Sequence, residues 1–170
     1  MKKILIITAD KCDDSELFYP YYRLIEEGYQ PTVASFAKTD VAAKYHFVIK
    51  ADISIEEIEP TAYEGLVLPG GQAPEKLRQN QTVLNVVKRF DEAKKPIAAI
   101  CHGQQILISA GILKDKKATC YPGIRDDLIN AGALYQNDSV VVCENIVTSR
   151  RPEDLPFFMK AFLDLLIHHS

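Results

Sequence analysis

The stretch 96-PIAAICHGQQILISAG-111 decides how the rest of this chain is interpreted. It opens with Ile97–Ile100, a short apolar run of the kind that forms a fully buried strand. Apolar side chains then recur at helical spacing, as at Ile106 and Ala110, and Gly111 is a typical helix stop. The stretch therefore predicts a buried strand that turns directly into a helix.

Cys101 lies where the two periodicities meet, and Gly103 follows two residues later. A strand that turns sharply into a helix exposes the residue at the turn, as in the nucleophile elbow of Gly-x-Ser-x-Gly enzymes. Because a helix N-terminus favours an anion, we expect Cys101 to ionise readily and the His102 amide to face an oxyanion. The alternative is a small buried cysteine without a chemical role.

Composition and charge indicate one globular domain over residues 1–170. The chain is 47% hydrophobic and 25% charged, and its net charge of −3 offers no attraction for nucleic acid or an anionic membrane. No apolar run is long enough for a signal-peptide core or a membrane span. Four cysteines without a CxxC pair argue against a metal site or a disulfide framework and indicate a reduced, cytoplasmic setting. We expect no cofactor.

Strands and helices alternate along the whole chain. The predicted strands are Lys3–Ala9, Gln30–Phe36, an edge-hairpin arm at Tyr45–Ala51, Gly65–Leu68, Ile97–Ile100, Lys117–Cys120, Ala133–Gln136, Ser139–Cys143 and Ile146–Ser149. The predicted helices are Leu17–Glu27, Pro74–Arg78, Thr82–Lys94, Gly123–Ala131 and Pro152–His168, with Thr82 as the cap of the third. Pro20 is compatible with the first of them if it lies in the first turn. A tight turn at Asn137-Asp138 is expected to join two of the strands. This alternation predicts an α/β fold with a mostly parallel central sheet.

Three loops should meet at one edge of such a sheet, beyond the carboxyl ends of the strands. They are Asp10–Glu16, Pro69–Ala73 and Cys101–Gly103. In the second loop Gly70 and Gly71 let the backbone approach a ligand closely. We therefore expect a substrate to bind where these loops surround the cysteine.

Several side chains near this edge are candidates for proton transfer or substrate binding. A protonated Glu16 would share a proton with the thiol and hold the thiolate, while Asp13 and Glu75 are further acidic candidates. His102 is a candidate general base or acid, and Tyr121 is a candidate pocket wall. The alternative is that the acids are helix N-terminal residues favoured by the dipole, and that the rings only pack.

The motifs taken in order resemble the PfpI-type intracellular proteases of the ThiJ/PfpI superfamily over nearly the whole chain. The matching segments are Thr8–Asp10, Asp13–Leu17, Tyr19–Pro20, Leu66–Gly71, Ala73–Glu75, Ala99–Gly103, Tyr121–Gly123 and Thr148–Arg150. The resemblance implies a flavodoxin-like three-layer sandwich in which Cys101 is the nucleophile and Glu16 contacts its thiol. It further implies an oxyanion hole made by the amides of Gly71 and His102.

The same resemblance carries expectations about assembly and substrates. It implies that Glu75 of an adjacent subunit completes His102, within dimers that can build hexamers. Asp13 stands where relatives usually carry Glu, and Gln104 replaces a common proline, with little expected consequence because the added amide lies in the first helical turn. The implied activities are those of a peptidase, a glutathione-independent glyoxalase or a deglycase of protein or nucleotide. All of them begin with thiolate attack on the carbonyl carbon of a small reactive carbonyl compound or a peptide.

Two other functions remain open from the sequence. A glutamine amidotransferase shares the elbow but normally needs a later His and Glu, and Ser149–Asp154 contains no His. A redox-sensing or stress-protective thiol protein without turnover would oxidise Cys101 to a sulfinic acid stabilised by a protonated Glu16. Loss of turnover in Cys101→Ser would favour the enzyme over that sensor.

Overall fold

The computed structural model describes residues 1–169 and is built around a seven-stranded sheet in the order β10-β11-β7-β6-β1-β2-β5. Its strands are β1 (Lys3–Ile7), β2 (Gln30–Ser35), β5 (Ile53–Ser54), β6 (Gly65–Leu68), β7 (Ile97–Ile100), β10 (Val141–Cys143) and β11 (Ile146–Ser149). All neighbouring strands are parallel except the β10–β11 hairpin. The predicted α/β class with a mostly parallel sheet is confirmed. Ser170, which the predicted domain includes, lies outside the described residues.

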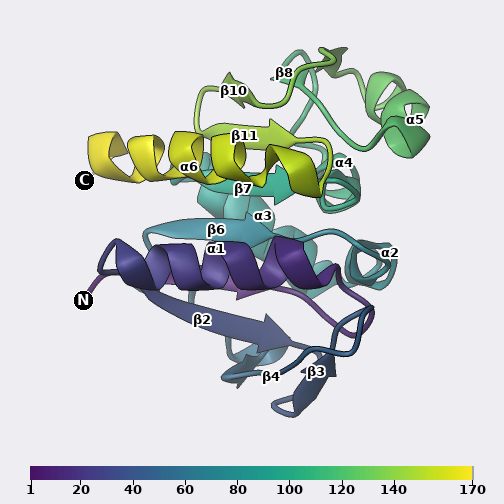
Figure 1. Cartoon of the computed structure of the whole chain (residues 1–170). Helices are drawn as coiled ribbons and strands as arrows, with labels where there is room; N and C mark the ends of the chain where they lie inside the picture. The colour runs from purple at the N-terminus through teal and green to yellow at the C-terminus, as the bar shows by residue number, and fades with distance from the viewer. Residues whose placement is uncertain (170) are drawn as a thin grey trace.

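Helices cover both faces of this sheet and make three layers (Figure 1). The long helices α1 (Asp14–Glu26) and α6 (Leu155–His169) lie together on one face, and α2 (Ala73–Leu77), α3 (Gln81–Glu92) and α4 (Gln104–Ala110) lie on the other. The strands β6 and β7 are buried along their whole length because helices cover them on both sides. The short helix α5 (Arg125–Asn130) lies beyond one edge.

Short elements fill the connections. The 3₁₀ turns are η1 (Ile55–Glu57), η2 (Pro60–Ala62), η3 (Pro122–Ile124) and η4 (Pro152–Asp154). The strands β3 (Asp40–Ala42) and β4 (Val48–Lys50) form an antiparallel hairpin, and β8 (Lys117–Ala118) pairs in parallel with β9 (Leu134–Tyr135). The predicted edge-hairpin arm is therefore present, with shorter bounds.

The first helix begins earlier than predicted. Asp13 caps it, because its carboxylate accepts hydrogen bonds from the backbone N–H groups of Ser15 and Glu16 at 3.1 and 3.3 Å. Pro20 consequently lies in the helix interior and not in the first turn, where a proline is readily tolerated. In α3 the cap is Asn80 rather than Thr82, and the Asn80 side-chain oxygen accepts the Val83 N–H at 3.0 Å.

The predicted tight turn at Asn137-Asp138 does not join two paired strands. β9 pairs with β8, outside the central sheet, while β10 pairs with β11. The N–H groups of Leu134 and Gln136 donate to the carbonyls of Lys116 and Ala118 at 2.8 and 2.9 Å, which fixes β9 beside a distant segment. A pattern that marks short strands does not specify which of them pair.

Gln104 has a larger structural role than predicted. Its side chain is fully buried at the start of α4, and Nε2 donates to the carbonyl oxygens of Thr119 and Ser149 at 2.9 and 2.7 Å. The side chain therefore ties the helix after β7 to the end of β11 and to the segment after β8. A proline at this position offers no such donor.

We predict that Gln104→Leu destabilises the fold by about 2–4 kcal/mol, because the buried Thr119 carbonyl oxygen loses its donor and that of Ser149 keeps only the Cys101 N–H. Urea unfolding followed by circular dichroism measures this change. Gln105→Leu is the matched control, since Gln105 is only half-buried, and should change the free energy of unfolding by less than about 1 kcal/mol. Equal effects of the two substitutions would show that the Gln104 hydrogen bonds add nothing beyond packing.

Candidate active site

Cys101 occupies a strained turn between β7 and α4. Its φ of 63° lies in the left-handed region that non-glycine residues seldom adopt, and α4 starts at Gln104. Gly103 must lack a side chain, because a Cβ there would overlap the Leu68 carbonyl oxygen at the end of β6. Gly111 ends the helix in the left-handed conformation, as predicted. This is the strand–turn–helix geometry of a nucleophile elbow.

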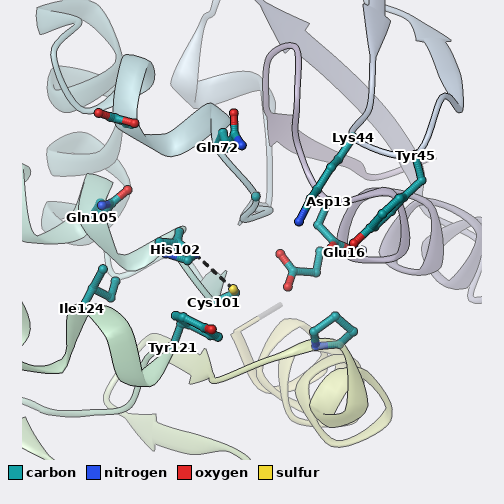
Figure 2. Close-up of a pocket in the computed structure, with 13 residues that line it drawn as sticks. Asp13, Glu16, Lys44, Tyr45, Gln72, Cys101, His102, Gln105, Tyr121 and Ile124 are labelled. Atoms are coloured by element: carbon teal, nitrogen blue, oxygen red, sulfur yellow. Dashed lines mark hydrogen bonds between the residues drawn. The ribbon is translucent and has the colours of Figure 1, made fainter.

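The thiol opens into a cavity of about 630 Å³ at the carboxyl ends of the strands (Figure 2). The cavity brings together seven of the eight predicted site residues: Asp13, Glu16, Gly71, Glu75, Cys101, His102 and Tyr121. Gly70, the eighth, lies directly behind Glu16 and Cys101. The three loops expected at this edge therefore meet there, although they are far apart in the sequence.

The Glu16 carboxyl is the most constrained group of the site. It is fully buried, and its Oε2 accepts the Gly70 N–H at 2.8 Å. Its Oε1 has no nitrogen or oxygen partner among the described residues, and the carboxyl interacts with the Cys101 thiol. A Cβ on Gly70 would lie 2.5 Å from Glu16 Oε2 and 2.9 Å from the Cys101 Cβ, so only glycine fits.

Burial sets the protonation of this pair. Desolvation, with help from the negative charge of Asp13, raises the pKa of Glu16 to about 8. Desolvation and the charge of Glu16 also raise the pKa of Cys101. A hydrogen bond from the His102 backbone lowers this pKa, but by less. The expected easy ionisation by the helix N-terminus is therefore outweighed by burial. The two groups titrate together, and a proton on Glu16 removes the charge that opposes the thiolate.

His102 lies beside the sulfur, with its Nδ1 at 3.3 Å from Cys101 Sγ. Its ring stacks on Tyr121 at 4.8 Å between centroids and 29° between planes. Burial lowers the pKa of His102, and the positive charge of Lys44 lowers it further. The imidazole is therefore neutral near neutral pH and can accept or donate a proton there.

Two of the acidic candidates have less direct positions. One oxygen of Asp13 is committed to the helix cap and also accepts the Ser15 hydroxyl at 2.6 Å. Glu75 is exposed on α2 at the cavity wall. Within residues 1–169 no carboxylate hydrogen-bonds to the His102 ring.

The loop between β3 and β4 forms a wall of the cavity that the sequence did not predict. Lys44 and Tyr45 line the cavity, although their segment showed no motif. The buried Asp14 carboxylate holds this loop, because it accepts the N–H groups of Tyr45 at 2.7 Å and Phe47 at 3.1 Å. In the sequence, the only indication of this contact is that Asp14 is an acidic residue in the first turn of α1. The remaining missed lining residues are Gln72, Gln105, Ile124 and Pro152.

Within residues 1–169, no cluster of three or more His, Cys, Asp or Glu side chains is placed to hold a metal ion. None of the helices in that range has the length and apolar character needed to cross a membrane. All four cysteines are free thiols.

Comparisons with known proteins identify relatives of this chain. Residues 2–165 match the DJ-1/PfpI family. Deglycase PfpI from Pyrococcus furiosus is 47% identical over 164 residues, which cover 96% of this chain and 99% of that relative. Protein/nucleic acid deglycase 2 from Escherichia coli is 38% identical over 168 residues, with coverages of 97% and 98%. The crystal structure of an Anabaena variabilis two-domain protein with DJ-1/ThiJ/PfpI-like and ferritin-like domains has a TM-score of 0.95 and 34% identity, over 98% of this chain and 48% of that one.

The raised pKa of Glu16 predicts that the free energy of unfolding falls as pH rises from about 4.5 to about 8. In this range the unfolded chain releases the proton, whose ordinary pKa is 4.5, while the folded chain keeps it until about 8. The slope contributed by this group approaches about 1.4 kcal/mol per pH unit. Urea titrations across this range measure it. Glu16→Gln should remove this slope, and parallel curves for the two proteins would contradict the buried, protonated carboxyl.

Proposed function

The chain belongs to the DJ-1/PfpI family, and we propose that it is a PfpI-type enzyme whose Cys101 thiolate attacks a carbonyl carbon. The observation that carries this proposal is the buried Glu16 carboxyl against the Cys101 thiol at the strained turn. A cysteine that served only packing would need neither an acidic partner nor a cavity. The deglycase names of relatives that are aligned over nearly the whole chain support the same chemistry. Four free thiols suit a cytoplasmic enzyme.

The first step follows from the positions of these groups. The thiolate of Cys101 adds to the carbonyl carbon, the carbon–oxygen π bond opens, and the oxygen becomes an oxyanion. We assign the amides of Gly71 and His102 to that oxyanion, since both residues line the cavity beside the sulfur. The protonated Glu16 and the neutral His102 are the groups available to deliver and remove protons afterwards.

The later steps depend on the substrate. With an α-oxoaldehyde, the adduct is a hemithioacetal, and movement of a proton between its two carbons gives a thioester. Water then releases a hydroxy acid, which is the outcome of a glyoxalase or deglycase. With a peptide, loss of the amine from the tetrahedral adduct gives an acyl-enzyme instead. Both courses use Cys101 and differ only after the first adduct.

We predict that purified protein converts methylglyoxal to lactate without glutathione, and that Cys101→Ser lowers this rate at least about a hundredfold. Enzymatic lactate assay and methylglyoxal consumption are measured in parallel. Cys143→Ser is the matched control, because Cys143 is a half-buried free thiol outside the cavity, and it should retain the activity. Circular dichroism checks that each variant is folded.

Other outcomes of this experiment have clear meanings. Consumption without lactate, equal in Cys101→Ser, would indicate only adducts on surface nucleophiles and would contradict the glyoxalase course. Cleavage of a peptide substrate that depends on Cys101 would then select the peptidase. Selective sulfinic oxidation of Cys101 by mild peroxide, with neither activity, would favour the redox-sensing or stress-protective protein.

We also propose that Glu75 acts across a subunit interface. The exposed carboxylate lies at the cavity wall, while the His102 ring has no carboxylate partner within residues 1–169. In a dimer, or in a hexamer built from dimers, Glu75 of one copy would orient His102 of the other. This arrangement would supply the acidic partner that the His102 ring lacks within residues 1–169.

Subunit complementation tests this arrangement. We predict that Glu75→Gln lowers activity about tenfold, and that Cys101→Ser is inactive. Co-expressed with different tags and purified as mixed oligomers, the two variants should together exceed the sum of their separate activities. In the mixed oligomer, an intact Cys101 meets an intact Glu75 from the other copy. Full activity of a stable monomer at high dilution would rule the arrangement out.

A further inference from the structure

Lys44 is placed unlike any other cation in the protein. Among the described residues that line the Cys101 cavity, it is the only lysine or arginine. Figure 2 shows its side chain extending into the cavity toward Asp13 and Glu16. The ammonium group forms no ion pair with a carboxylate of residues 1–169. Its Nζ lies 5.2 Å from the centroid of the Tyr45 ring, and a hydrogen bond with the Tyr45 side chain is the main cause that raises the pKa of Lys44.

The backbone that carries Lys44 is held on several sides. The Lys44 N–H donates to the Cys12 carbonyl at 2.8 Å. Before it, the Asp10 carboxylate accepts the Ala42 N–H at 2.9 Å. After it, the Asp14 carboxylate accepts the Tyr45 N–H at 2.7 Å. The loop that follows β1 therefore fixes the loop that carries the lysine, and a charge is presented to the cavity from a fixed backbone.

The neighbouring acids act on this charge through space, but neither Asp13 nor Glu16 forms an ion pair with it. An oxygen of Asp13 already accepts three hydrogen bonds within the cap of α1. Glu16 is protonated near neutral pH and faces Gly70 and the thiol instead. A cation in a cavity of about 630 Å³, without an ion-pair partner, is suited to bind an anionic group of a ligand.

We propose that Lys44 binds a carboxylate next to the reacting carbonyl, so that the site prefers α-oxo acids over neutral aldehydes of the same size. This inference rests on the proposed attack by Cys101 and adds the substrate class to it. The Cys101 Sγ–carbon bond forms, the carbonyl π bond opens, and the oxygen takes the proton shared by Cys101 and Glu16. The product is a hemithioacetal whose carboxylate stays paired with Lys44. The same contact would hold a hydroxy-acid product.

A matched pair of aldehydes tests the proposal. Glyoxylate and glyoxal are both two-carbon aldehydes of similar size. Glyoxylate has one aldehyde group and a carboxylate, whereas glyoxal has two aldehyde groups and no carboxylate. The concentration of each that half-protects Cys101 from iodoacetamide is read by mass spectrometry. We expect the preference for glyoxylate over glyoxal to fall at least tenfold in Lys44→Met and to return largely in Lys44→Arg. In Lys50→Met, which removes a charge from the same hairpin outside the cavity, the preference should persist.

A second measurement separates this inference from the proposed function. Lactate and lactamide are titrated calorimetrically into Cys101→Ser, with and without Lys44→Met. If lactate binds more tightly than lactamide and this difference depends on Lys44, the inference is supported. Failure of both aldehydes to protect Cys101 would refute only the role of Cys101 as nucleophile. A glyoxylate preference unchanged in Lys44→Met, an equal loss in Lys50→Met, or equal binding of lactate and lactamide overturns the inference.

Discussion

The shared proton between Glu16 and Cys101 is the constraint on which the rest of the site depends. Two acids without bulk water around them cannot both ionise cheaply, so the pair holds at most one negative charge. Gly70 lacks a side chain because both acids occupy the space that a Cβ would need, and its amide anchors the carboxyl. The nucleophile is thus prepared by burial with an acid, more than by the end of a seven-residue helix.

The fold supplies this burial by bringing three chain segments together. β1, β6 and β7 are neighbours in the sheet, so the loops that follow them meet at one edge. Because the strands are rigid and covered by helices, the turn at Cys101 can keep a positive φ without relaxing. Gln104 reinforces the turn from behind, since its amide joins α4 to Ser149 and Thr119. Strain at the nucleophile is therefore balanced by contacts that lie outside the cavity.

Local patterns in the sequence predicted those parts of the site that depend on residues close together in the chain and on the order of strands and helices. The apolar run before Cys101, the stop at Gly111 and the meeting of the three loops were all predicted and found. The pairing of β9 with β8 was not predicted, because hydrogen bonds between residues far apart in the sequence decide which short strands pair. Lys44 was missed for the same reason: the Asp14 carboxylate brings its loop to the cavity across about thirty residues of sequence.

The cavity has an inner part, predicted from local sequence patterns, and an outer part, positioned by hydrogen bonds between segments that are distant in sequence. The inner part holds Cys101 and Glu16, where almost any added atom would collide with backbone or carboxyl. The outer part holds two exposed residues. Lys44 lies in the β3–β4 hairpin and Glu75 lies on the short helix α2. A substitution there changes the charge that a ligand or a second subunit meets, and the charge of Lys44 reaches the shared proton only through space. Substrate preference and assembly can therefore vary on this fold while the attack on a carbonyl carbon stays the same.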